Sequence, residues 1–237
     1  MNKISIYKKK ALDDYFVFME NHPEFFKSRE LRMIIRERNL IEEYMEKNNT
    51  VIGVLVKTPY TIFVVDLVES RDVDNNIVCY PYQRSFNQKE INGAVNVVIL
   101  ATIENKINKI NEVILVNQER HSTGKFHLEL PRGFGEIGLS GEENSLKELR
   151  EETGYVGKNS TYIGSSYTDS GITNSKVSFY HIQILKKVDK DTKIEEPISN
   201  ILLLSVTKIW EKIRKGEIVD SYTIQALALF EKFRNIG

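Results

Sequence analysis

Three glutamates lie close together in the stretch SLKELREETGY, residues 145–155. Their spacings of three and four place Glu148, Glu151 and Glu152 on one face of a helix, where like charges repel each other. A bound cation would relieve that repulsion. The preceding loop, PRGFGEIG at 131–138, has glycines that permit tight turns and close approach to a ligand. A loop carbonyl opposite the acidic face would complete an all-oxygen site, which suits Mg²⁺ or Mn²⁺ bound together with phosphate. A solvated acidic helix face is the simpler alternative.

The ends of this helix are marked by local signals. Ser140 followed by Glu143 forms a capping box, and Gly154 is a typical C-terminal stop. The sequence therefore predicts a short helix over residues 141–153 that carries all three glutamates.

The stretch from residue 133 to residue 155 resembles the signature of the Nudix hydrolases, G-x5-E-x7-R-E-U-x-E-E-x-G-U, where U is a bulky apolar residue. The positions that match are Gly133, Glu148, Leu149, Glu151, Glu152, Gly154 and Tyr155. Two positions depart, because Leu139 stands where the family has glutamate and Lys147 where it has arginine. In the family that glutamate and arginine form mainly a structural ion pair. The departures therefore leave the metal ligands that the resemblance implies in place.

The surrounding sequence resembles one subgroup, the ADP-ribose and nucleotide-sugar pyrophosphatases. In that subgroup a Q-x-R triplet precedes an E-L/F-P-x-G turn, and the matching residues here are Gln118, Arg120, Glu129, Leu130 and Pro131. Two later segments, DSGITNSKVSFY at 169–180 and GEIVDSYTIQAL at 216–227, resemble further parts of the subgroup. The resemblance covers about residues 94–237.

The resemblance implies a metal site for Mg²⁺, with Mn²⁺ as the alternative. Its ligands would be Glu148, Glu152, Glu151 and the backbone carbonyl of Arg132. The catalytic candidates are Glu151 and a distant carboxylate in an acidic E-x-I context. Glu196 matches that context best and Glu195 is the alternate; the competing interpretation is an exposed pair in a loop.

The resemblance also implies residues that contact the substrate. These are Arg120, Gln118, the side chain of Arg132 and Gly133. The planar guanidinium of Arg120 would hold a diphosphate through two parallel hydrogen bonds. A structural salt bridge is the alternative for Arg120, and solvent exposure is the alternative for Arg132. We expect Glu129 to be structural or to lie at a dimer interface, and Asp220 with Thr223 to cap a helix.

The elements that must position these residues follow from the sequence pattern. Residues 9–48 read as helical, with an interruption at His22-Pro23 and a second segment from about 28 to 47. Strand-like runs follow from residue 50 onward, then the glutamate helix, further strands and two C-terminal helices. We expect an α+β protein with the Nudix fold, an α/β/α sandwich with a mixed sheet. Its domains would be an N-terminal helical extension at 1–49 and a Nudix domain at 50–237, with N-terminal strands at 50–93 and a core at 94–237.

Composition narrows the functional class. The 237 residues contain 33 basic and 33 acidic side chains, so bulk charge does not favour nucleic acid or a membrane as a partner. The longest apolar runs are too short to cross a bilayer. A single cysteine, Cys79, rules out an internal disulfide and fits a reducing compartment. We therefore expect a cytoplasmic protein with no nucleic-acid partner and no membrane partner.

The expected activity is Mg²⁺-dependent hydrolysis of the diphosphate bond in a nucleoside diphosphate linked to another moiety. ADP-ribose, giving AMP and ribose 5-phosphate, is the leading substrate. The alternatives are another sugar nucleotide such as GDP-mannose, a nucleoside triphosphate, or a Nudix-like sensor that binds nucleotide without cleaving it. We also expect a homodimer with residues 1–93 at the contact; a monomer with the helices folded back as a lid is the competing idea.

Overall fold

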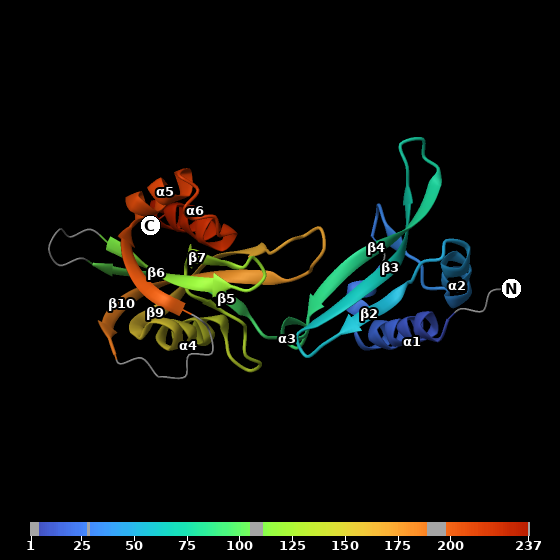
Figure 1. Cartoon of the computed structure of the whole chain (residues 1–237), viewed down its shortest axis with the longest axis horizontal. Helices are drawn as coiled ribbons and strands as arrows, with labels where there is room; N and C mark the ends of the chain where they lie inside the picture. The colour runs from blue at the N-terminus through green and yellow to red at the C-terminus, as the bar shows by residue number, and fades with distance from the viewer. Residues whose placement is uncertain (1–4, 28, 105–110, 189–197, 237) are drawn as a thin grey trace. The chain divides into compact units, whose positions relative to one another are not determined.

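The structure is a computed structural model that describes residues 5–27, 29–104, 111–188 and 198–236. It divides into two units (Figure 1). The first contains Met1–Ile91 and Thr168–Ser175, and the second contains Asn92–Tyr167 and Lys176–Gly237. Among the described residues, no helix combines the length and apolar character that a membrane crossing requires.

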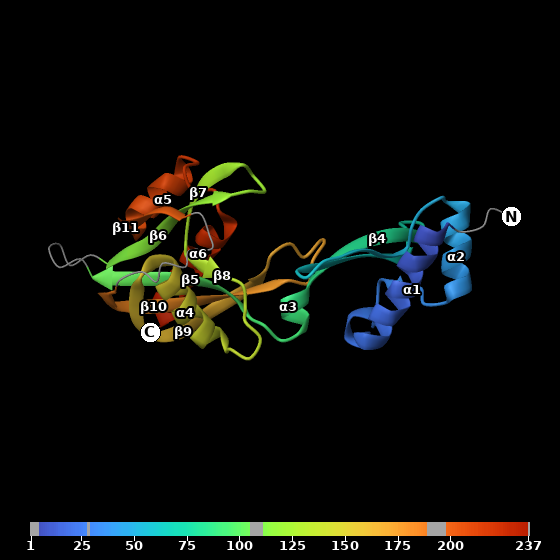
Figure 2. The same cartoon turned by 60° about the horizontal axis from the view of Figure 1, so that its bottom comes forward.

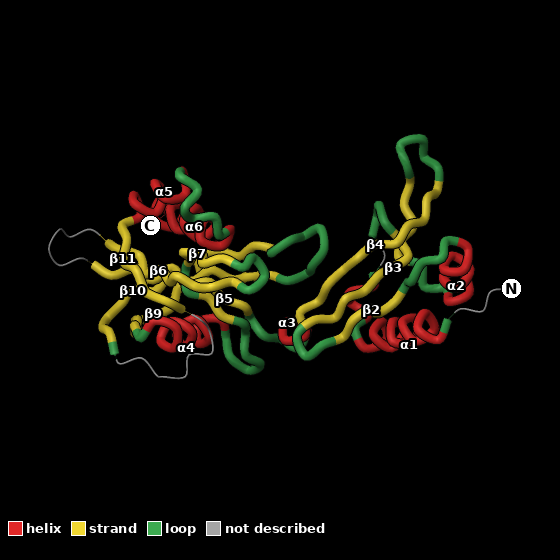
Figure 3. Tube along the Cα trace, in the orientation of Figure 1, coloured by secondary structure: helices red, strands yellow, loops and turns green. Residues whose placement is uncertain are grey.

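The first unit combines helices with an antiparallel sheet. Its elements are α1 (Ile6–Asn21), a 3-10 turn η1 (Pro23–Phe26), β1 (Met33–Ile34), α2 (Arg38–Lys47), β2 (Gly53–Lys57), β3 (Thr61–Arg71), β4 (Ile77–Asn87) and α3 (Gln88–Ile91). The strands β1, β2 and β4 all pair with β3, and β3 and β4 form a long hairpin (Figure 3). The helix α1 ends just before His22-Pro23, as expected from the restricted backbone of a residue that precedes proline.

The expected helix from residue 28 to residue 47 is only partly correct. It begins at Arg38, because Met33 and Ile34 instead pair with Glu69 and Val68 of β3. Pairing with a strand distant in sequence has overridden the local helix preference of this segment.

The helices α1 and α2 share one core with the strands that follow them. Leu12 and Tyr15 of α1, Ile41 of α2 and Val64 of β3 are buried in the same cluster, and Figure 2 shows α1 and α2 beside these strands. The Tyr15 hydroxyl donates to Asp66 of β3 at 2.7 Å. By contacts the first unit runs to Ile91; the domain boundaries expected from the sequence, after residues 49 and 93, stay a prediction.

The second unit is built on a seven-stranded mixed sheet. Its strands are β5 (Asn96–Glu104), β6 (Asn111–Arg120), β7 (Lys125–Glu129), β8 (Arg132–Gly133), β9 (Tyr155–Tyr167), β10 (Lys176–Lys187) and β11 (Ile198–Ser205). The order is β11-β6-β5-β10-β9, with β7 beside β6 and β8 beside β5. The β5–β10 pair is parallel, and the other pairs are antiparallel.

Helices cover both faces of this sheet. The helix α4 (Gly141–Thr153) lies on one face, and α5 (Val206–Arg214) and α6 (Ser221–Ile236) lie on the other (Figure 1). Alternate residues of β5 show why: Val98 and Leu100 pack in the cluster that includes α6, whereas Ile99 and Ala101 pack with Leu149 of α4. The expected α/β/α sandwich is therefore confirmed.

Candidate active site

The helix α4 begins and ends as the sequence predicts. The Ser140 hydroxyl accepts the N–H of Glu143, and the Glu143 carboxylate accepts the N–H of Ser140. At the other end Gly154 has a φ of 72°, in the left-handed region that glycine adopts without strain. Contacts within a few residues therefore fix both ends of the helix that carries the three glutamates.

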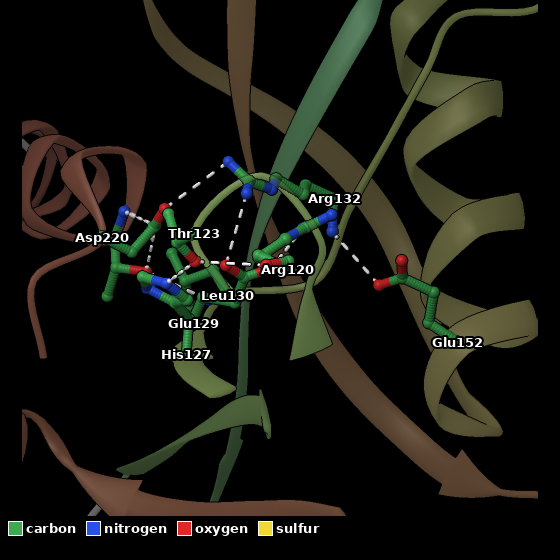
Figure 4. A network of polar contacts seen from close by, with 9 residues as sticks. Arg120, Thr123, His127, Glu129, Leu130, Arg132, Glu152 and Asp220 are labelled. Carbon is green, nitrogen blue, oxygen red and sulfur yellow. Dashed lines mark hydrogen bonds and ion pairs between the residues drawn. The ribbon is translucent and has the colours of Figure 1, made fainter. Parts of the chain in front are cut away.

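Two of the glutamates lie against the short strand β8. Glu152 is buried, and its Oε2 accepts the backbone N–H of Arg132 at 3.2 Å (Figure 4). Glu148 lies beside Gly133, where an added Cβ would be 2.0 Å from the Glu148 Cδ. Glycine at this position is therefore what leaves room for the Glu148 carboxylate. Both carboxylates meet the backbone of residues 132–133, as a metal site of the expected kind requires.

This donor set suits a hard divalent cation. The carboxylates of Glu148 and Glu152 offer only oxygen, which Mg²⁺ and Mn²⁺ prefer. Within the described ranges, however, no three His, Cys, Asp or Glu side chains gather closely enough to hold a metal ion. A cation here would therefore need backbone, water or substrate oxygens in addition to the two carboxylates.

The third glutamate, Glu151, belongs to a different set of contacts. It is exposed, and its Oε2 lies 3.2 Å from Nζ of Lys147. The same ammonium lies 2.6 Å from Oε1 of Glu136, and this hydrogen bond is the main cause that raises the pKa of Lys147. Leu139 occupies the position where the family has its acid, so here Glu136, three residues earlier, provides the partner of Lys147. The sequence reasoning missed Glu136 because it lies outside the signature positions.

Two buried asparagines hold the glycine-containing loop at residues 131–138, called the glycine loop below. Asn96 at the start of β5 accepts the N–H of Gly135 at 3.0 Å. Asn144 of α4 donates to the carbonyls of Val95 and Phe134, each at 3.3 Å. An added Cβ at Gly135 would lie 2.3 Å from the Val95 nitrogen. These contacts tie the loop, the helix and the first strand of the sheet together, and neither asparagine was identified from the sequence.

A buried carboxylate, Glu129 at the end of β7, joins the two arginines expected at the substrate. Arg120 hydrogen-bonds Oε1 of Glu129, and Nη2 of Arg132 lies 3.3 Å from Oε2 (Figure 4). Burial raises the pKa of Glu129, while the two guanidiniums act in the opposite direction. Arg132 also approaches Asp220, with 3.5 Å between Nη1 and Oδ1. Glu129 thus holds both arginines at one place, and its expected role, structural or at a dimer interface, stays a prediction.

The other expected site residues lie elsewhere or outside the described ranges. Gln118 is buried with 2% of its surface exposed, in a strand position between β7 and β11. Glu195 and Glu196 fall among residues 189–197, outside the part of the chain that the structure describes. Asp220 and Thr223 form the expected helix cap, because Oδ2 of Asp220 accepts the N–H of Thr223 at 2.8 Å.

Comparison with known proteins identifies the family of this chain. The model of the NUDIX domain matches residues 93–226, which is more than half of the chain. The chain therefore belongs to the Nudix family, and the resemblance seen in the sequence is confirmed.

The chain is also similar to named relatives and to a solved structure. It is 31% identical over 143 residues to an ADP-ribose pyrophosphatase of Bacillus subtilis, covering 59% of this chain and 74% of that protein. It is 45% identical over 62 residues to the ADP-sugar pyrophosphatase of Mus musculus, covering 26% of this chain and 28% of that one. A solved structure of an ADP compounds hydrolase superposes with a TM-score of 0.60 at 15% identity, covering 87% of this chain and 96% of that one. At that identity the structural likeness supports the fold alone.

Proposed function

We propose that the protein hydrolyses the diphosphate bond of a nucleoside diphosphate linked to another moiety, and that Mg²⁺ is required. The leading substrate is ADP-ribose, which gives AMP and ribose 5-phosphate. The observation that carries the proposal is the meeting of Glu148 and Glu152 with the backbone of Arg132 and Gly133. The relatives named as ADP-ribose and ADP-sugar pyrophosphatases favour this substrate class.

In this proposal one set of residues binds the cation and another set binds the diphosphate. Glu148, Glu152 and the Arg132 carbonyl hold the cation, which when bound neutralises phosphate charge and lowers the pKa of a bound water. Arg120 and Arg132 hold the diphosphate. Their shared contact with Glu129 fixes the direction of both guanidiniums, and a fixed direction is what paired hydrogen bonds to phosphate require.

The reaction itself is a displacement at phosphorus. The water oxygen forms a bond to one phosphorus, the bond from that phosphorus to the bridging oxygen breaks, and the bridging oxygen leaves with the other phosphate. A carboxylate accepts the proton of the water. Glu151, Glu196 and Glu195 are the candidates for this base. Among them Glu151 lies 3.2 Å from Nζ of Lys147.

A substrate panel tests the proposal directly. The purified protein with Mg²⁺ is incubated with ADP-ribose, GDP-mannose and a nucleoside triphosphate, and the products are separated by chromatography. We expect AMP from ADP-ribose as the fastest reaction. Glu152→Gln keeps the size of the side chain and removes its charge, so turnover should fall by about 10² or more. Glu142→Gln removes the same charge from an exposed position of the same helix and should leave turnover unchanged.

The alternatives give different results in the same panel. Faster cleavage of GDP-mannose or of the triphosphate would replace ADP-ribose as the substrate. A sensor would bind ADP-ribose in calorimetry and release no product at any Mg²⁺ concentration. Near wild-type turnover of Glu152→Gln at saturating Mg²⁺ would remove α4 from the metal site.

The expected homodimer stays a prediction. Apolar residues of the N-terminal segment that could form such a contact are largely used within the first unit, where Ile41 is buried and Ile34, Ile35 and Tyr44 pack against the same core. Leu31 remains 81% exposed. Light scattering on the full chain decides, and a monomer at all concentrations would contradict the prediction. The cytoplasmic location also stays a prediction, which cell fractionation tests.

A further inference from the structure

The N-terminus of α6 contacts the turn that leads into the glycine loop. Thr223 is fully buried, and its Oγ1 donates to Oδ2 of Asp220 at 2.8 Å. The same oxygen accepts the backbone N–H of Leu130 at 3.0 Å. A residue in the first turn of α6 therefore anchors the backbone of a turn 93 residues earlier in the chain.

A second contact joins the same two segments. Nη1 of Arg132 lies 3.5 Å from Oδ1 of Asp220, and the Arg132 guanidinium lies 4.8 Å from the centre of the Tyr222 ring. The side chains of Asp220 and Arg132 are 9% and 22% exposed. Because the pair is largely shielded from water, its attraction is screened less than that of a surface ion pair.

Both contacts act on residues that also belong to the candidate active site. The N–H of Arg132 donates to Glu152, and the Arg132 side chain shares the carboxylate of Glu129 with Arg120. The turn at 129–132 is thus held by α4 on one side and by α6 on the other. Loss of the hold by α6 would let the turn shift while the glutamates of α4 stay in place.

We infer that Asp220 and Thr223 are positioning residues for the reaction, beyond their role as a helix cap. They hold the turn so that the Arg132 backbone meets Glu152 and both arginines stay at Glu129. The inference rests on the proposed function for its kinetic effects. A misplacement of about 1 Å at a reacting site can cost on the order of 10²-fold in rate, so loss of these contacts should lower the rate as well as the stability.

Substitutions at Thr223 separate positioning from capping. Thr223→Val keeps the shape and removes the oxygen that binds the Leu130 N–H, whereas Thr223→Ser retains that oxygen. We expect kcat/KM for ADP-ribose to fall about tenfold in Thr223→Val and the Mg²⁺ concentration for half-maximal rate to rise. Thr223→Ser should restore both. The matched control is Ser205→Ala, which removes the cap of α5 and should lower the melting temperature while leaving both kinetic values unchanged.

A readout that needs no activity accompanies the kinetics. Amide hydrogen exchange at Leu130 should become faster in Thr223→Val relative to the global unfolding rate, and Thr223→Ser should return it to the wild-type rate. If the wild-type protein cleaves no nucleotide, the proposed function fails, while the exchange measurement still tests the anchor. Wild-type kcat/KM, or unchanged Leu130 exchange, in a folded Thr223→Val protein would overturn the inference.

A double-mutant cycle tests the ion pair. Asp220→Asn keeps an oxygen for the helix cap and removes the charge that faces Arg132. We expect a severalfold fall in kcat/KM in the wild-type background and no further fall in the Arg132→Met background. An equal fall in both backgrounds would mean that Asp220 does not act through Arg132, and the inference for Asp220 would be wrong.

Discussion

Gly133→Ala tests the candidate metal site by adding a single methyl group beside one carboxylate. The new Cβ would lie 2.0 Å from Cδ of Glu148 and 2.3 and 2.4 Å from its two oxygens. Ordinary carbon contacts are about 3.5 Å or longer, so the carboxylate has to move by roughly 1 Å or more. The methyl group therefore displaces an expected ligand without removing it.

The effect of Gly133→Ala on stability should be much smaller than its effect on activity. Gly133 has no left-handed φ, and the obstructing atoms belong to the end of a flexible side chain. The free energy of unfolding should therefore change by less than about 1 kcal/mol, since alanine also lowers the entropy of the unfolded chain. A ligand misplaced by about 1 Å should lower kcat/KM on the order of 10²-fold. Calorimetry gives the stability, and AMP release at increasing Mg²⁺ gives the activity.

Gly124→Ala is the matched control with the opposite pattern. Gly124 has a φ of +62° and no neighbouring atom within 4 Å of an added Cβ. Alanine there should cost about 1 kcal/mol of stability through backbone strain and leave activity intact. Wild-type kcat/KM and Mg²⁺ dependence in Gly133→Ala would refute the assignment of Glu148 as a ligand. A large loss of stability in that variant would mean that the Glu148 side chain cannot move.

Two further predictions concern charged groups. Glu136→Gln should lower stability by at most about 1 kcal/mol, because its ion pair with Lys147 is partly exposed. Leu139→Glu should be tolerated alone and should restore thermal stability in the Glu136→Gln background; total loss of activity in the single variant would show another role for Leu139. Burial lowers the pKa of His181 below its usual 6.5, so the folded protein keeps this side chain neutral and the free energy of unfolding should fall as the pH drops below about 6.5. In chemical denaturation at several pH values, His181→Gln should weaken this dependence; equal slopes in the wild-type and His181→Gln proteins would contradict the assignment.

Features that depend on neighbouring residues were predictable from the sequence. The ends of α4 follow from Ser140, Glu143 and Gly154, whose contacts span three or four residues. The order of strands and helices in the second unit follows from alternating and helical patterns of apolar residues. Capping signals of this kind can be recognised in the sequence, because the residues that contact each other lie within one helical turn.

Features that depend on distant residues were not predictable in this way. Residues 33–34 lie in a segment rich in helix formers, yet they pair with β3. One partner of Lys147 is Glu136, eleven positions away, and one partner of Arg132 is Asp220, which caps α6. No spacing rule links the members of these pairs, because only the folded structure brings them together.

The three glutamates of α4 show how one helix can carry such charges. Glu151 is exposed and pairs with Lys147, so the positive charge of this lysine, on the same helix, offsets part of the repulsion among the glutamates. Glu152 is buried, and its carboxylate accepts a backbone N–H from β8, so this polar group has a partner within the protein. Glu148 lies in the space that Gly133 leaves open. The helix can therefore fold with these charges in place, and the two carboxylates beside β8 are the ones positioned to gain from a cation.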